Sequence, residues 1–264
     1  MVEKTREYIR DGDIFQAVIS RSLRPPLRQS LKRLPGAADH KSIPLYVYMN
    51  LGETEIISAS PETLVRLKDG RLITFPVAGS RPRGNSPSED EALEAELLAD
   101  EKELAEHNML VDLGRNDIGR ISSFGTVEVT QYQMIHKYSR IMHICSQVEG
   151  KIGEGCGRLL RVEALLPAGT LSGAPKIRAC QIIEEMEQVP RGIYGGALGY
   201  LDLTGNMDTC IAIRMAVKEN GSVTVQAGGG IVADSVPERE YEESENKAGA
   251  VMQAIMYAGE ADDI

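Results

Sequence analysis

The sequence predicts an α+β fold in which antiparallel strand meanders are flanked by helices. Two groups of short β-prone runs with turn signals between them lie near residues 44–79 and 195–227. Segments with helical spacing and capping residues separate these groups and follow the second one. Because the strands cluster instead of alternating singly with helices, this order favours α+β over a doubly wound parallel sheet.

The first meander contains the runs PLYVYMN, EIISAS, TLVRL and RLITFPVAG. The pair Asp69-Gly70 separates two alternating runs and predicts a tight hairpin. The second meander contains GGALGYLDL, DTCIAIRMAV and SVTVQAG, with turn residues between the runs. The proline-containing stretch at residues 25–35, ahead of the first meander, is expected to be an irregular connection.

Helices are predicted from capping patterns and apolar spacing. The pairs Ser88/Glu91 and Asp100/Glu103 match the capping box, so one bent helix or two consecutive helices are expected, ending at Gly114. Further helices are expected at about residues 138–149 and 174–188. A last helix is expected after Pro237, and its apolar stripe consists of Ala248, Val251, Met252 and Ile255.

Composition excludes several classes of protein. The 264 residues include 29 Lys plus Arg against 39 Asp plus Glu, a formal net charge of −10, which argues against nucleic-acid binding. No run reaches the roughly 18 apolar residues of a membrane span, and the charged N-terminal stretch lacks a signal-peptide core. Four scattered cysteines show no metal-ligand spacing and are expected to be reduced thiols. We therefore expect a cytoplasmic protein that binds neither membranes nor nucleic acids.

Two predicted helices carry acidic groups that could hold a metal. Glu106 shares a helix face with apolar residues, and Glu240, Glu243 and Lys247 share a face of the last helix. Solvated ion pairs would account for this spacing. Alternatively, Glu106 and Glu243 each bring a carboxylate to Mg²⁺, which usually takes one or two protein carboxylates and completes its shell with water and substrate oxygens.

Glycine clusters and single charged side chains are the other candidates. Glycines at residues 79, 169–173, 195–196 and 228–230 fall where backbone N–H groups can approach an anion, although such glycines are often only conformational. Arg214 lies in the apolar run CIAIRMAV, a predicted strand, where it forms either a structural ion pair or a bidentate grip on a carboxylate. His107 and His143 are candidate acid-base groups, but a lone histidine is more often structural.

Several long motifs resemble the chorismate-binding enzymes, and among them component I of anthranilate synthase. The resemblance covers about residues 11–258 and predicts one chorismate-binding catalytic domain over residues 1–264. It implies a sheet sandwich flanked by helices, and Mg²⁺-dependent amination of chorismate by ammonia with loss of pyruvate. The motifs are PVAGSRPRG, DEKELAEHNMLVDLGRNDIGRIS, LPAGTLSGAPKIRA, YGGALGYL, DTCIAIR and QAGGGIVADSVPEREYEESENKA.

The resemblance also assigns roles to residues. Glu106 and Glu243 match the magnesium ligands, Glu62 matches a general acid for the leaving hydroxyl, and His143 matches a histidine associated with pyruvate elimination. The positions that match chorismate contacts are Gly79, Ser80, Thr170, Tyr194, Arg214, Gly228, Gly229 and Gly230.

Two positions separate branches of the family. Ala78 stands where aminodeoxychorismate synthases often carry a nucleophilic lysine, and Gln16 stands where isochorismate and salicylate synthases carry a lysine base. Because Gln16 cannot deprotonate water, the resemblance favours ammonia as the nucleophile. Ser80 replaces a usual threonine and keeps its hydroxyl. Gly229 replaces a common alanine and so widens the glycine cradle.

Members of the family are usually nearly twice as long, so the resemblance implies that the N-terminal part of the family fold is missing here. In the family, a glutamine amidotransferase subunit, component II, supplies ammonia, and we leave open whether the chain forms a homo-oligomer or a heterotetramer. Two alternatives also stay open. One is an aminodeoxyisochorismate synthase that stops before pyruvate loss, and the other is a non-catalytic chorismate-binding fragment.

Overall fold

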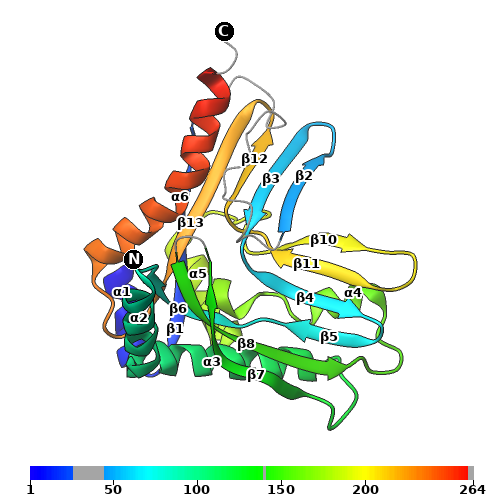
Figure 1. Cartoon of the computed structure of the whole chain (residues 1–264). Coiled ribbons are helices and arrows are strands. Elements are labelled where there is room, and N and C mark those ends of the chain that lie inside the picture. Colours follow the sequence, from blue (N-terminus) through cyan, green and yellow to red (C-terminus); the bar gives the residue numbers. More distant parts are fainter. Residues whose placement is uncertain (26–44, 139–140, 261–264) are drawn as a thin grey trace.

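Two antiparallel sheets form the centre of the molecule, and helices pack against them (Figure 1). The computed structural model describes residues 1–25, 45–138 and 141–260. In spatial order the first sheet contains β2 (Leu45–Asn50), β3 (Thr54–Ser60), β12 (Met215–Glu219), β13 (Ser222–Ile231), β1 (Gln16–Leu23) and β9 (Gly173–Ala174). The second contains β10 (Ala197–Leu201), β11 (Met207–Ile211), β4 (Thr63–Lys68), β5 (Arg71–Thr74), β8 (Ile141–Lys151) and β6 (Val77–Pro82), with β7 (Glu128–Lys137) paired to β8. The predicted α+β class is confirmed.

Each predicted meander contributes strands to both sheets. Strands β2 and β3 join the first sheet, whereas β4, β5 and β6 join the second, and the second meander divides in the same way. The predicted hairpin joins β4 to β5, and both turn residues have positive φ, 49° at Asp69 and 80° at Gly70. The irregular connection expected at residues 25–35 falls, from residue 26 onward, outside the described residues.

Two consecutive helices, α2 (Pro87–Ala99) and α3 (Glu101–Gly119), follow β6. Asp100 caps α3 as predicted, but the cap of α2 is Ser86, whose hydroxyl accepts a hydrogen bond from the N–H of Glu89. The predicted end at Gly114 is wrong, because α3 continues for five more residues. Gly114 instead permits close packing, since a Cβ there would lie 3.3 Å from Pro76. The other helices are α1 (Val2–Arg10), α4 (Arg158–Glu163), the 3-10 turn η2 (Gly169–Leu171), α5 (Lys176–Glu187) and α6 (Pro237–Glu260).

The helix expected at residues 138–149 is wrong, because residues 141–151 form strand β8. This strand pairs with β5, β6 and β7, and the hydrogen bonds and packing of these pairings outweigh any local preference for a helix. Its alternate residues Met142, Ile144, Ser146 and Val148 are all buried, which is the two-residue period of a strand.

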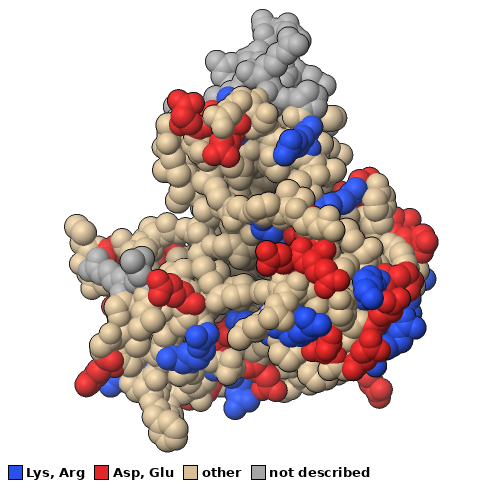
Figure 2. Space-filling view, turned by 180° about the vertical axis from the view of Figure 1, so that it is seen from behind, with Lys and Arg blue, Asp and Glu red and all other residues tan. Residues whose placement is uncertain are grey.

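Helix α6 lies along β13, as Figure 1 shows. Its stripe confirms the prediction, since Ala248, Val251 and Ile255 are buried against Val223 and Val225 while Met252 is partly buried. No helix in the described ranges is long and apolar enough to cross a membrane. On the face shown in Figure 2, basic side chains are interspersed with acidic ones and form no broad basic patch.

Candidate active site

Near its C-terminal end, β13 carries three consecutive glycines, Gly228, Gly229 and Gly230, which form a cradle without side chains. A Cβ on Gly229 would lie 3.0 Å from Oε2 of Glu240 and 3.8 Å from Oε1 of Glu243, both on the first turns of α6. A Cβ on Gly230 would lie 2.3 Å from Nε2 of Gln16, so only glycine leaves room for that buried amide. The glycine strand therefore brings two carboxylates and Gln16 to one place.

Helix α3 adds further carboxylates to the same region. The pKa of Glu106 is raised, first by burial and then by the negative charges of Glu103 and Glu243. Lys102 and Lys247 oppose this rise, and Nζ of Lys247 lies 2.5 Å from Oε1 of Glu243 and 3.1 Å from the carbonyl oxygen of Gly228. Like charges face one another here with little neutralisation, which is an environment that attracts a cation.

The donor set of this cluster fits Mg²⁺ better than a metal held by protein alone. Within the described residues, no three His, Cys, Asp or Glu side chains lie close enough to form a metal site. Two carboxylates, Glu106 and Glu243, interact with each other across α3 and α6. Mg²⁺ is commonly held in this way, because substrate oxygens and water complete its octahedral shell.

Arg214 is a half-buried cation, and no carboxylate of the described residues forms an ion pair with it. It lies between β11 and β12 with a positive φ of 49°, so it belongs to the connection and not to a continuous strand as predicted. Its Nη1 donates a hydrogen bond to the carbonyl of Lys247 at 3.2 Å, and burial lowers its pKa. Tyr194 and Glu243 partly offset this loss of solvation. A half-buried guanidinium in such a position suits a carboxylate ligand.

Glu62 and Thr170 form another wall of the site. Burial raises the pKa of Glu62 to about 6, while Thr170 and the positive charge of Lys247 oppose the rise. The buried hydroxyl of Thr170 faces this carboxyl without meeting hydrogen-bond geometry, and it has no partner among the described residues. Tyr194, whose pKa burial raises to about 12, lies within electrostatic reach of both Glu62 and Arg214. A carboxyl with a pKa near 6 is suited to donate a proton.

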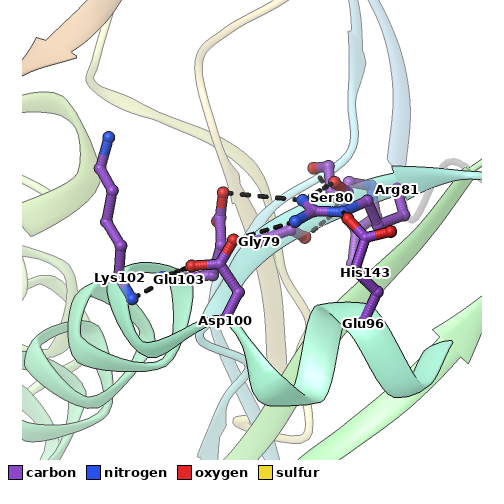
Figure 3. A network of polar contacts seen from close by, with 8 residues as sticks. All are labelled: Gly79, Ser80, Arg81, Glu96, Asp100, Lys102, Glu103 and His143. Atoms are coloured by element: carbon purple, nitrogen blue, oxygen red, sulfur yellow. Dashed lines mark hydrogen bonds and ion pairs between the residues drawn. The ribbon is translucent and has the colours of Figure 1, made fainter. Parts of the chain in front are cut away.

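His143 completes the opposite side of the site on β8. Its Nδ1 lies 3.0 Å from the carbonyl oxygen of Gly79 and 2.9 Å from Oγ of Ser80, on the paired strand β6 (Figure 3). A carbonyl only accepts, so Nδ1 carries the proton and Nε2 is left as the acceptor. Burial lowers the pKa of His143, which keeps the ring neutral near pH 7.

Arg81 fixes this side of the site to helices α2 and α3. Figure 3 shows its guanidinium between Glu96, Asp100 and Glu103, with nitrogen–oxygen distances of 2.8, 2.9 and 3.9 Å. The Oε2 atom of Glu103 would also lie 3.2 Å from a Cβ on Gly79. These contacts hold the strand that carries Gly79 against the helix that carries Glu106.

The structure thus brings all thirteen predicted site residues into one connected region, and it adds others. Sequence reasoning missed Glu103, Glu240, Lys247 and Arg81 as members of the site. Both helices carry glutamates at i and i+3, and this repeated spacing was the available signal for the first two. His107 is not part of the site: it is fully buried in the core, with Nε2 2.7 Å from Oγ of Ser146.

Two curated relatives are similar to this chain over nearly its whole length. Component 1 of anthranilate synthase from Methanothermobacter thermautotrophicus is 53% identical over 264 residues, covering 100% of this chain and 57% of that protein. The same component from Acetivibrio thermocellus is 54% identical over 260 residues, covering 98% and 53%. The chain therefore spans about half the length of the curated relatives it matches.

Solved structures and a family model agree with these relatives. The crystal structure of anthranilate synthase component I from Streptococcus pneumoniae superposes with a TM-score of 0.87 at 44% identity, covering 95% of this chain and 56% of that one. A putative isochorismate synthase from Bacillus anthracis, DhbC, gives 0.81 at 30% identity, covering 96% and 70%. The model of the chorismate binding enzymes matches residues 1–253. The chain belongs to the chorismate-binding enzyme family.

Proposed function

We propose that this chain carries the catalytic centre of an anthranilate synthase component I. In this reaction ammonia adds at C2 of chorismate, the C4 hydroxyl leaves, and elimination of pyruvate gives anthranilate. One observation carries the proposal: the half-buried Arg214 forms no ion pair with a carboxylate of the described residues, and it lies near a carboxylate cluster that includes Glu243 and has excess negative charge. A dicarboxylate substrate together with Mg²⁺ would satisfy both.

Each side of the site has a separate task in this proposal. Arg214 and Tyr194 bind and orient one carboxylate of chorismate beside the glycine strand. Glu106 and Glu243 would hold Mg²⁺, which would neutralise charge at the ring carboxylate and polarise the substrate for loss of the C4 hydroxyl. Glu62 protonates the C4 hydroxyl, which leaves as water.

The second half of the reaction uses the other wall. His143 presents an unprotonated Nε2, because Nδ1 donates its proton to the carbonyl of Gly79. We assign this nitrogen the removal of the C2 proton as pyruvate departs. Gln16 lies over Gly230 and cannot deprotonate water, which supports ammonia as the nucleophile over the hydration catalysed by isochorismate synthases.

The proposed reaction also needs a source of ammonia. A glutamine amidotransferase, component II, would supply ammonia, and the free state of all four cysteines supports function in the reducing cytoplasm. An aminodeoxyisochorismate synthase is the alternative, and a product that keeps the enolpyruvyl ether would favour it. The unprotonated Nε2 of His143 supports the complete reaction, because elimination of pyruvate needs a base.

The test is formation of fluorescent anthranilate by the purified chain with chorismate, Mg²⁺ and ammonium at mildly alkaline pH. We expect fluorescence that EDTA abolishes and added Mg²⁺ restores. If fluorescence is absent, mass spectrometry of the mixture decides between the alternatives. An aminated enolpyruvyl product would indicate the shorter reaction, and bound but unchanged chorismate would indicate a non-catalytic fragment.

A further inference from the structure

A small cavity lies behind Glu62, on the side away from the glycine strand. It has a volume of about 50 Å³, and Glu62, Thr170 and Asp117 are among the residues that line it. Its lining in the described part of the chain includes none of the cradle glycines, nor Arg214 or Tyr194. Glu62 and Thr170 are therefore the wall that separates this cavity from the substrate side.

The cavity is polar enough to be hydrated. The buried Thr170 hydroxyl has no partner within the described residues, and such a group is costly to leave unpaired. Glu62 and Asp117 add carboxyl oxygens, so a water here would find the two or more polar partners that stable occupancy needs. The volume is sufficient for about three water molecules.

The far end of the cavity is a nearly buried ion pair. Both oxygens of Asp117 accept hydrogen bonds from Nζ of Lys176, at 2.7 and 2.6 Å, and the third donor of Lys176 faces the carbonyl of Leu165 at 3.4 Å. The side chains of Asp117 and Lys176 are 11% and 16% exposed, so the pair reaches the surface. Asp117 thus connects the cavity with solvent.

We propose that two or three waters in this cavity link Glu62 to Asp117 and return a proton to Glu62 after each turnover. The inference rests on the proposed function, in which Glu62 is the general acid. In that step the O–H bond of Glu62 breaks, an O–H bond forms on the C4 oxygen, and the C4–O bond breaks with its electron pair leaving on water.

The return step restores the carboxyl without any further reagent. The nearest water gives Glu62 a proton and takes one from its neighbour, and Asp117 passes a proton from solvent to the last water. Addition of ammonia at C2 releases one proton to solvent, so the cycle neither gains nor loses a proton. Asp117 acts through water and is a relay residue, and Lys176 orients it.

The first test is a high-resolution crystal structure of the wild-type protein. We expect ordered waters within hydrogen-bond distance of Glu62, Thr170 and Asp117. A dry cavity would overturn the inference and leave the proposed function untouched. Failure of the wild type to aminate chorismate would instead contradict the proposed function, and with it the role of Glu62.

The second test measures turnover in Asp117→Asn combined with Lys176→Gln, which replaces the ion pair by a neutral pair of similar size. We expect kcat to fall about 10- to 100-fold, less than the 10²–10⁴-fold typical of the general acid itself, with KM unchanged and a larger solvent deuterium isotope effect. Asp112→Asn, an exposed carboxylate on the same helix, is the control and should change neither value. A folded double variant with wild-type kcat and isotope effect would show that the pair is only structural.

Discussion

The Nδ1 atom of His143 lies 3.0 Å from the carbonyl oxygen of Gly79, and this contact determines which ring nitrogen is available for chemistry. Because the carbonyl accepts only, the proton resides on Nδ1 and the lone pair on Nε2. The strand pairing of β6 with β8 thus sets the tautomer of a side chain in the candidate site.

Replacing this ring should separate the two halves of the reaction. His143→Asn keeps a donor near the position of Nδ1 but lacks Nε2, so we expect amination to continue while pyruvate elimination slows by about 10²–10⁴-fold. The aminated enolpyruvyl intermediate should then accumulate and can be measured by mass spectrometry. His136 is the exposed cross-strand neighbour, and His136→Asn should leave the product unchanged. Normal anthranilate output from His143→Asn would remove His143 from the mechanism.

The raised pKa of Glu62 predicts a pH dependence. The acid form, which donates the proton, is present below a pKa of about 6 in the free protein and is lost as pH rises through that value. We therefore expect kcat/KM to decline above pH 6 when it is expressed per concentration of un-ionised ammonia. The decline of kcat with rising pH should begin at a higher pH than that of kcat/KM, because bound chorismate is an anion and disfavours ionisation of Glu62.

The control for this profile is Glu62→Gln, which has no proton to lose. It should reduce turnover by about 10²–10⁴-fold and should lack the alkaline limb. A variant with the same limb as wild type would assign the titration to another group.

The carboxylate pair predicts a loss of magnesium binding. Glu106→Gln or Glu243→Gln removes one of two protein ligands, so we expect turnover to be abolished and the Mg²⁺ affinity measured by calorimetry to fall at least about tenfold. Glu242→Gln, on the exposed side of α6, is the matched control. Unchanged Mg²⁺ affinity in both ligand variants would place the metal elsewhere.

Arg214 predicts a specific loss of substrate affinity. Arg214→Ala removes a half-buried cation, and chorismate binding should weaken by about 2–5 kcal/mol if the pair with its carboxylate is desolvated. The dissociation constant can be measured by calorimetry with Mg²⁺ present. Arg66 is already paired with Asp208 at 2.8 Å, so Arg66→Ala should not change that constant. Equal affinities for wild type and Arg214→Ala would exclude this role.

Local signals predicted most of the fold, and they failed where tertiary contacts decide. The hairpin at Asp69-Gly70 and the last helix carry strong short-range patterns, and both are confirmed. The helix predicted at residues 138–149 is instead strand β8, although Ile141, Ile144, Cys145 and Val148 also fall at helical spacing. Its neighbours β5, β6 and β7 come from distant segments, and no local pattern encodes that pairing.

The same division applies to the site. Motif resemblance selected residues from β1, β6, β8, β13, η2, α3 and α6 and from the connections that contain Glu62, Tyr194 and Arg214, and the structure places them together. Sequence spacing left the role of Arg214 open, because only the fold shows that no carboxylate of the described residues forms an ion pair with it, although Glu243 lies within electrostatic reach. The glutamate spacing indicated the helix face of Glu240, but its approach to Gly229 depends on packing between elements. The cavity between Glu62 and Asp117 depends on such packing too and has no sequence signature.

The most direct measurement is the stoichiometry of products formed by this chain from chorismate and ¹⁵N-labelled ammonium in the presence of Mg²⁺. Mass spectrometry would quantify anthranilate and pyruvate in the same sample. We predict equal amounts of both, with all the anthranilate carrying the label and no product when EDTA is present. An unlabelled hydroxylated product, or a labelled product without pyruvate, would contradict the assignment of this site to anthranilate synthesis.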